Sequence, residues 1–218
     1  MNNVQKEALR YLGYRGNEPD EATAELLEKG YNELSAVAMK RCCYKVADKT
    51  AVESLLVGND IKKHLSASER VIFFAATLGS AADSVIRRAE IGNMAYALIL
   101  DALASALIEE YCDLEENEIK NKIGGSFTWR YSPGYGDYPI ELQPDVISFL
   151  NAEKQIGLTV TESNILLPRK SVTAVIGVWI RSSRRGSAVV KYVLCVRNVR
   201  SVKAGKPAEK KNNGGIYG

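Results

Sequence analysis

The chain has 218 residues, of which 46% are hydrophobic and 25% are charged, and its formal net charge is +3. This composition is typical of globular proteins and excludes a fibrous or largely disordered chain. A chain of this length buries about 70% of the surface that its unfolded form exposes, so one compact domain can hold its core without metals or disulfides.

Helical patterns dominate the first 125 residues. Apolar side chains recur at helical spacing in five segments, which predict helices over residues 3–11, 18–38, 59–65, 80–90 and 93–122. The β-branched and aromatic run at 70–77 predicts a buried strand that leads into the helix at Ser80, and a strand-to-helix turn of this kind often faces a ligand. The short apolar runs at 43–46 and 51–57 fit either strands or buried connectors.

The character of the sequence changes after Gly125. The patterns predict a strand at 127–131, a loop rich in Pro, Gly and Tyr at 132–139, a helix at 142–155 and strands at 158–161 and 172–180. Helices and strands follow one another without regular alternation. This order favours an α+β fold in which long helices pack around a twisted, mainly antiparallel sheet.

Charge divides the chain into two parts. Residues 181–218 hold ten Lys and Arg and one acidic residue, a net charge of +9, which leaves −6 for residues 1–180. Periodicity is lost from about residue 181, so we expect one domain over 1–180 and a basic, partly disordered C-terminal tail over 181–218. The tail carries few interleaved aromatic residues and no strong helical pattern, so a solvated tail is favoured over one that binds nucleic acid or a membrane. The alternative, a nucleic-acid-associated protein, predicts binding that falls steeply with salt.

Cysteine and histidine are sparse. The chain has four cysteines without a CxxC pair, and its single histidine is His64, so we expect no metal site. Residues 1–10 do not resemble a secretory leader, and no apolar run approaches the ~20 residues that span a bilayer. We therefore expect reduced thiols, small core roles for Cys42, Cys43 and Cys112, and a cytoplasmic protein without membrane attachment.

Common catalytic motifs are absent. The sequence contains no P-loop, no GxGxxG and no GxSxG, which removes the usual grounds for a P-loop nucleotidase, a dinucleotide-binding enzyme or a serine hydrolase.

The densest unusual stretch is residues 130–137, Arg-Tyr-Ser-Pro-Gly-Tyr-Gly-Asp. Arg130 can pair bidentately with a carboxylate or phosphate, and Tyr131 or Tyr135 can cover a flat ring. Gly134 and Gly136 remove side chains where a ligand could approach the main chain. The stretch fits a loop that binds a small molecule or a partner, and equally a tight structural turn.

This stretch is part of a wider set of motifs that occur in a consistent order over residues 52–178. The set comprises AATLG at 75–79, RYSPGY at 130–135, ELQ at 141–143, LTVTES at 158–163 and LLP at 166–168, preceded by LRYLGY at 9–14. Together these motifs resemble the activation domain of cobalamin-dependent methionine synthase, most closely the stand-alone proteins that correspond to this domain.

The resemblance implies a function. The family binds S-adenosylmethionine and supports reductive reactivation, in which oxidised cobalamin takes an electron from a flavodoxin-type donor and a methyl group from S-adenosylmethionine. The resemblance implies that Arg130 holds the methionine carboxylate and that Tyr135 faces cobalamin held by a partner, a methionine synthase or other corrinoid protein. The backbone implied to meet the adenosine belongs to Tyr131, Ser132, Pro133 and Gly134. Side chains would orient the ligand, so no general acid or base is expected.

Other positions follow or depart from the family pattern. Glu162, between Thr161 and Ser163, is implied to line the same cleft. Ser105 stands where the synthase domain has a carboxylate for the ligand's ammonium group, and Glu109, one helical turn further, is its candidate replacement. An aromatic residue expected at 175–177 is absent. These departures motivate a second hypothesis, a non-catalytic corrinoid-protein partner that has lost S-adenosylmethionine binding.

Overall fold

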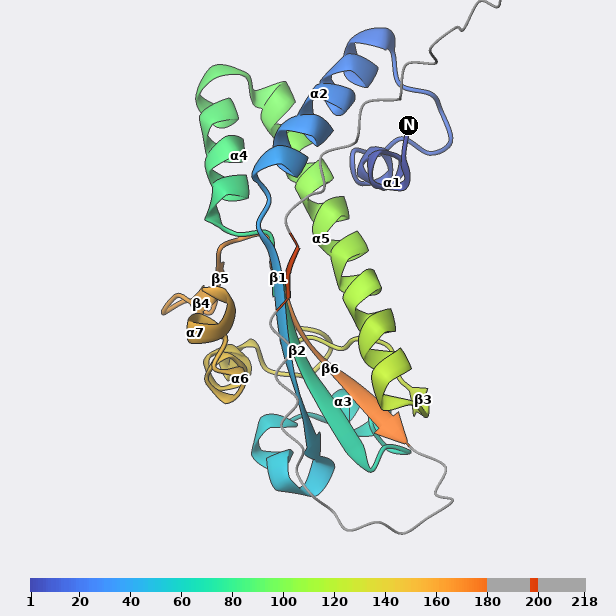
Figure 1. The fold of residues 1–218 in the computed structure, drawn as a ribbon, viewed down its shortest axis with the longest axis vertical. Coiled ribbons are helices and arrows are strands. Elements are labelled where there is room, and N and C mark those ends of the chain that lie inside the picture. Colours follow the sequence, from blue (N-terminus) through green and yellow to red (C-terminus); the bar gives the residue numbers. More distant parts are fainter. Residues whose placement is uncertain (180–196, 200–218) are drawn as a thin grey trace, which may run out of the picture.

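The computed structural model describes residues 1–179 and 197–199. Its centre is an antiparallel sheet with the strand order β3-β6-β2-β1-β7 (Figure 1). These strands are β1 (Lys40–Asp48), β2 (Arg70–Thr77), β3 (Ser126–Phe127), β6 (Ser171–Trp179) and β7 (Arg197–Val199). The predicted strand at 70–77 is confirmed as β2, which pairs along its whole length with β1 on one side and with β6 on the other.

The long helix α5 (Met94–Ile123) lies against one face of this sheet, and three further helices pack on α5. They are α1 (Asn3–Tyr11), α2 (Glu21–Val37) and α4 (Ser80–Gly92). Alternate residues of β1 and β2, including Tyr44 and Phe74, are buried in one core with these helices. Helix α5 crosses the sheet, and α1, α2 and α4 surround its first half (Figure 1).

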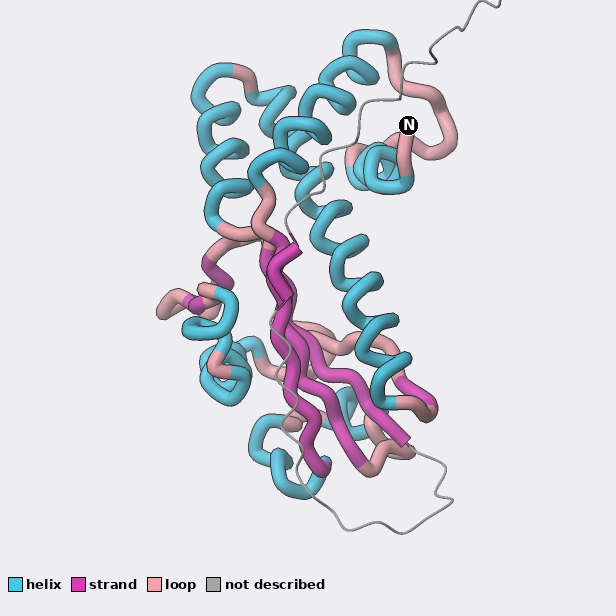
Figure 2. The backbone as a smooth tube through the Cα atoms, viewed as in Figure 1, coloured by secondary structure: helices cyan, strands magenta, loops and turns pink. Residues whose placement is uncertain are grey.

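Shorter helices cover the opposite face, as Figure 2 shows. They are the 3₁₀ helix η1 (Lys49–Leu55), α3 (Asn59–His64), α6 (Gln143–Leu150) and α7 (Ala152–Ile156). Cys43, Phe73 and Val175 point to this side and belong to a second core. Because both faces of β2 are buried, its sequence is a continuous apolar run rather than an alternating one. The α+β class with an antiparallel sheet is therefore confirmed.

Three predicted elements differ from the structure. The helix expected at 142–155 is split into α6 and α7 because Asn151 adopts a left-handed conformation (φ 53°), which asparagine tolerates better than most residues. The apolar run at 51–57, for which either a strand or a buried connector was expected, falls mostly in the 3₁₀ helix η1, in which Val52 is the buried residue. The strand expected at 158–161 is reduced to β4 (Thr159–Val160), which pairs with β5 (Leu166–Leu167) in a separate two-stranded sheet.

The expected basic tail, residues 181–218, lies outside the described residues except for Arg197–Val199, which form β7 beside β1. Cys42, Cys43 and Cys112 are buried and form no disulfide among the described residues, as expected of small core residues. Burial raises the pKa of the Cys43 thiol to about 12, so this thiol stays protonated at neutral pH. Among the described helices, none combines the length and the apolar character that crossing a membrane requires.

Candidate functional site

The segment before the Pro-Gly-Tyr loop runs along the outer edge of β6. The amide of Thr128 donates to the carbonyl of Gly177 (3.0 Å), and Tyr131 and Val175 exchange two backbone hydrogen bonds (2.9 and 2.8 Å). The strand predicted at 127–131 is thus present as β3 followed by an isolated bridge. Between these pairings the side chain of Arg130 reaches α5.

Arg130 meets three carboxylates of α5. Its Nη2 donates to Glu109 (2.9 Å) and to Asp113 (2.8 Å), and its Nη1 donates to Glu116 (2.5 Å). The three acids are spaced by four and three residues, which places them on one face of the helix. Arg130 is largely buried, with a side-chain exposure of 16%, whereas Asp113 is exposed.

The charges of this cluster do not cancel. Lys120 forms an ion pair with Glu116, so the cluster holds two cations and three carboxylates. Burial disfavours the charged form of Arg130, but the negative groups around it, among them Asp113 and Glu116, outweigh burial and raise its pKa. Arg130 therefore stays charged, and its surroundings are negative overall.

The loop after Arg130 is built as a tight turn. The amide of Gly134 donates to the carbonyl of Tyr138 (2.8 Å), and the amide of Tyr138 donates to the carbonyl of Tyr135 (3.0 Å). The Tyr138 hydroxyl is buried and donates to the carbonyl of Leu55 (2.8 Å). Ser132 is half-buried and Pro133 is buried, so the start of the loop is part of the protein interior.

The glycines of the loop face protein atoms. A Cβ on Gly134 would lie 3.2 Å from the Cδ1 of Ile140, and a Cβ on Gly136 would lie 2.3 Å from a carboxylate oxygen of Asp60. The prediction that these glycines leave room for a ligand is therefore wrong. They are needed because the turn packs closely against Ile140 and Asp60.

Asp137 fixes the loop to α3. Its carboxylate accepts hydrogen bonds from the amides of Asn59 (2.6 Å) and Asp60 (2.9 Å) at the start of that helix. These amide donors lower the pKa of Asp137. The start of α3 is thus capped by a carboxylate from the loop.

Aromatic rings border the loop. Trp129 and Tyr135 are exposed, at 71% and 65%, whereas the His64 ring is half-buried and contacts Trp129 (4.7 Å between ring centroids) and Tyr131 (5.0 Å). The Nε2 atom of His64 lies 2.9 Å from the carbonyl of Trp129. The His64 side chain therefore supports the loop through its contacts with Trp129 and Tyr131.

These groups line a cleft of about 500 Å³. Its lining comprises Glu109, Asp113, Glu116, Trp129, Arg130, Tyr131, Ser132, Tyr135 and Val172. The cleft offers a buried cation, exposed carboxylates and flat rings. Such a set suits a small ligand that carries both charges and an aromatic ring. In the described part of the chain, no group of three or more His, Cys, Asp or Glu side chains is placed to hold a metal ion.

The structure brings together Glu109, Arg130, Tyr131, Ser132 and Tyr135, five of the residues that the sequence singled out. Glu162 is exposed in the turn between β4 and β5 and is not among the described residues that line this cleft.

Two departures noted in the sequence have structural explanations. The Ser105 hydroxyl accepts a hydrogen bond from Lys170 Nζ (2.9 Å), so a lysine occupies the surroundings of this position. A Cβ on Gly177 would lie 2.2 Å from Ser68 Oγ and 2.9 Å from a methyl group of Leu65. The packing of these two side chains leaves no room for an aromatic ring at that point of β6.

Sequence reasoning missed Asp113, Glu116 and Trp129 as cleft residues. The acids carried a signal, since their spacing from Glu109 marks one helix face. The sequence also held a signal for Trp129, because this large aromatic residue directly precedes Arg130 in the strand-like segment.

Comparisons with known proteins bear on the fold. No protein-family model matches the chain, and no curated protein matches it. Among solved structures, a crystal structure of the MetH reactivation domain bound to AdoHcy is similar, with a TM-score of 0.56 and 15% sequence identity over 83% of this chain and 77% of that one. The chain has the fold of the MetH reactivation domain. At this identity the likeness shows the fold alone.

Proposed function

We propose that this chain binds S-adenosylmethionine in the Arg130 cleft and supports reductive remethylation of oxidised cobalamin on a separate methionine synthase. The observation that carries the proposal is Arg130 between carboxylates of α5 and exposed aromatic rings, in a cleft of about 500 Å³. Further support comes from the solved structure of similar fold, which has AdoHcy bound.

The charges of the cleft match those of the ligand. S-adenosylmethionine carries a carboxylate, an ammonium and a sulfonium group. Three of the five N–H donors of Arg130 are directed at α5, which leaves donors for the ligand carboxylate. Glu109 and Asp113 are exposed enough to meet the ammonium group. The net negative charge of the cluster favours the sulfonium cation, so we expect S-adenosylmethionine to bind more tightly than uncharged-sulfur analogues such as AdoHcy.

The exposed aromatic rings of the cleft suit the adenine ring of the ligand and the corrin ring held by the partner. Trp129 and Tyr135 present flat apolar surface at the rim of the cleft: the Trp129 ring is placed to cover the adenine, and the Tyr135 ring faces the corrin of the partner. Cobalamin held by the partner would supply the methyl acceptor after an electron from a flavodoxin-type donor has reduced it, and S-adenosylmethionine would leave as AdoHcy. This chain holds the sulfonium group in place, and its rim side chains exclude water from the site of transfer.

The first test is calorimetric titration of the full chain with S-adenosylmethionine, with AdoHcy, methionine and adenosine for comparison. We expect saturable binding that is lost in Arg130→Ala and kept in Arg88→Ala, an exposed arginine of α4 that does not line the cleft. Absence of binding by the unmodified chain, or equal loss in both variants, would contradict the proposed ligand site.

The partner role has its own test. Tyr135→Ala removes a ring that is 65% exposed, so the fold and S-adenosylmethionine binding are expected to persist. Reactivation of a methionine synthase that lacks its own activation domain is expected to fall. If binding and reactivation fall together, Tyr135 acts on the ligand or on the fold and not on the partner.

Two observations favour the second candidate, a corrinoid-protein partner that does not bind S-adenosylmethionine. Arg130 already has three carboxylate acceptors, and Lys170 lies against Ser105 where the family pattern has an acid. This candidate predicts co-purification with a corrinoid protein together with no heat of binding for S-adenosylmethionine.

A further inference from the structure

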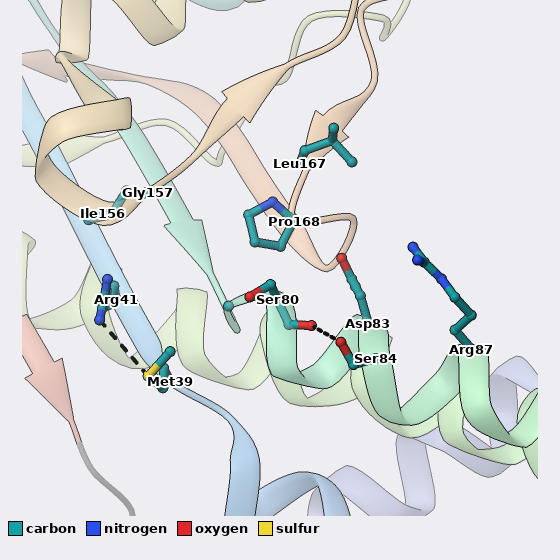
Figure 3. A pocket seen from close by; sticks show the side chains of 11 residues that line it. Met39, Arg41, Ser80, Asp83, Ser84, Arg87, Ile156, Gly157, Leu167 and Pro168 are labelled. Atoms are coloured by element: carbon teal, nitrogen blue, oxygen red, sulfur yellow. Dashed lines mark hydrogen bonds between the residues drawn. The ribbon is translucent and has the colours of Figure 1, made fainter.

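A second pocket lies where β2 ends and α4 begins (Figure 3). Its volume is about 500 Å³, and it has no lining residue in common with the Arg130 cleft. It is lined by Met39, Arg41, Gly79, Ser80, Asp83, Ser84, Arg87, Ile156, Gly157, Leu167 and Pro168. This is the strand-to-helix turn that the sequence marked as a place where ligands often bind, and the function proposed above does not use it.

Two arginines line this pocket, and neither has a carboxylate partner in the part of the chain that the structure describes. Neither Arg41 nor Arg87 forms an ion pair with a carboxylate in residues 1–179. Among the described residues, the buried Nε atom of Arg41 has no hydrogen-bond acceptor, and the Nη2 atom has only the weak contact with the sulfur of Met39, at 3.9 Å. A buried guanidinium donor without an acceptor is costly, so this position favours an anionic acceptor.

The start of helix α4 adds positive electrostatic potential between the two arginines. Figure 3 shows Arg41 and Arg87 on opposite sides, with Ser80 at the start of α4 between them. Helix α4 has 13 residues, and its N-cap Gly79 (φ 81°) makes no side-chain capping hydrogen bond. The first amides of α4 are therefore free of a side-chain cap at the positive end of the helix dipole.

Asp83 is the one acidic residue in the lining, and it opposes an anion. Its carboxylate accepts a hydrogen bond from the amide of Arg169 (2.7 Å), which fixes it to the loop before β6. Two arginines against one aspartate still leave the pocket positive. Apolar side chains complete the wall, among them Met39, Leu167 and Pro168.

We propose that this pocket binds a phosphate group carried by a small molecule. Arg41 and Arg87 hold the phosphate oxygens from two sides, the first amides of α4 donate to it, and the apolar wall takes the uncharged part of the ligand. The site is separate from the Arg130 cleft and does not depend on the function of that cleft.

The test is calorimetric titration of the full chain with inorganic phosphate and with phenyl phosphate, each against sodium chloride of equal ionic strength. We expect saturable binding of both, with phenyl phosphate tighter because of the apolar wall. Arg41→Gln is expected to weaken binding about tenfold or more, since it removes charge-assisted hydrogen bonds. Asp83→Asn is expected to strengthen binding, because it removes the opposing charge.

The controls separate this site from general charge effects. Arg88→Gln removes an exposed arginine of the same helix that does not line the pocket, so it is expected to leave phosphate affinity unchanged. Arg87 is exposed, so Arg87→Gln provides a folded variant should Arg41→Gln unfold the chain. Binding of S-adenosylmethionine is expected to be the same in all these variants. No saturable phosphate binding, or equal weakening by Arg88→Gln and Arg87→Gln, would overturn the proposal.

Discussion

Two arginines of this protein have opposite surroundings. Arg130 donates to three carboxylates of α5, whereas the buried Nε atom of Arg41 has no acceptor among the described residues. Each residue lines a pocket of about 500 Å³. An arginine surrounded by acids makes a site that prefers ligands with cationic groups, and an arginine without acids makes a site that prefers anions.

The two sites also differ in how their loops are held. The loop beside Arg130 is locked to α3 by Asp137 and by the close packing of Gly136. At the Arg41 pocket, Gly157 follows α7 with a positive φ of 71°, and a Cβ there would meet nothing within 4 Å. Both glycines adopt left-handed backbone, but only Gly136 is also constrained by its neighbours.

The largest expected effect comes from breaking the loop beside Arg130. In Gly136→Ala the new Cβ would lie 2.3 Å from Asp60 Oδ2 and 2.5 Å from the Tyr131 hydroxyl, at a φ of 51°. Left-handed backbone strain and this overlap together are expected to lower the free energy of unfolding by about 3 kcal/mol. Urea unfolding followed by tryptophan fluorescence measures the change.

Gly157→Ala is the matched control from the other site. It carries the same kind of backbone strain without an overlap, so a loss of only about 1 kcal/mol is expected. Equal losses in the two variants would show that Asp60 and Tyr131 move aside and that the loop is not locked.

The bounds of the helices and strands around both sites were predictable where an element is buried on all sides or on one constant face. The pattern over 70–77 gave the bounds of β2 because every position from Val71 onward is buried, so the whole strand is apolar. The helix over 3–11 was equally clear, because its apolar positions keep one face. The break at Asn151 was hidden, since apolar residues continue on both sides of it and only the backbone angle separates α6 from α7.

The candidate site was predictable only in part. Local sequence marked Arg130 and the turn after it, but its acceptors lie 14 to 21 residues earlier on α5. Asp137, which caps α3, lies 78 positions after Asn59, from whose amide it accepts a hydrogen bond. Such contacts depend on how the elements pack against one another. The spacing of apolar residues predicts whether a segment is a helix or a strand, but it does not predict which other segment it contacts.

The carboxylates around Arg130 contact the same guanidinium group but differ in how deeply they are buried, so they test how burial changes the strength of an ion pair. The Glu116 side chain is 11% exposed and that of Asp113 is 67% exposed. Glu116→Gln is expected to cost about 1–3 kcal/mol, because it removes a buried charge partner of Arg130. Asp113→Asn is expected to cost less than about 1 kcal/mol, because water screens this pair. Urea unfolding of both variants under one set of conditions gives the ranking, and a larger loss for Asp113→Asn would contradict the assigned burial.

The smallest expected effect is the acid release of the loop from α3. Amide donors of Asp60 and Asn59 lower the pKa of Asp137 below its ordinary value of 3.8, so the folded chain holds this carboxylate ionised more readily than the unfolded chain does. The stabilisation is therefore complete above pH 3.8 and is lost as the pH falls through the lowered folded pKa. Amide chemical shifts of Asn59 and Asp60, followed by NMR during acid titration, are expected to change with a midpoint below 3.8. In Asp137→Asn this titration is expected to disappear, whereas a midpoint at or above 3.8 in the unmodified chain would show that the carboxylate does not cap α3 in solution.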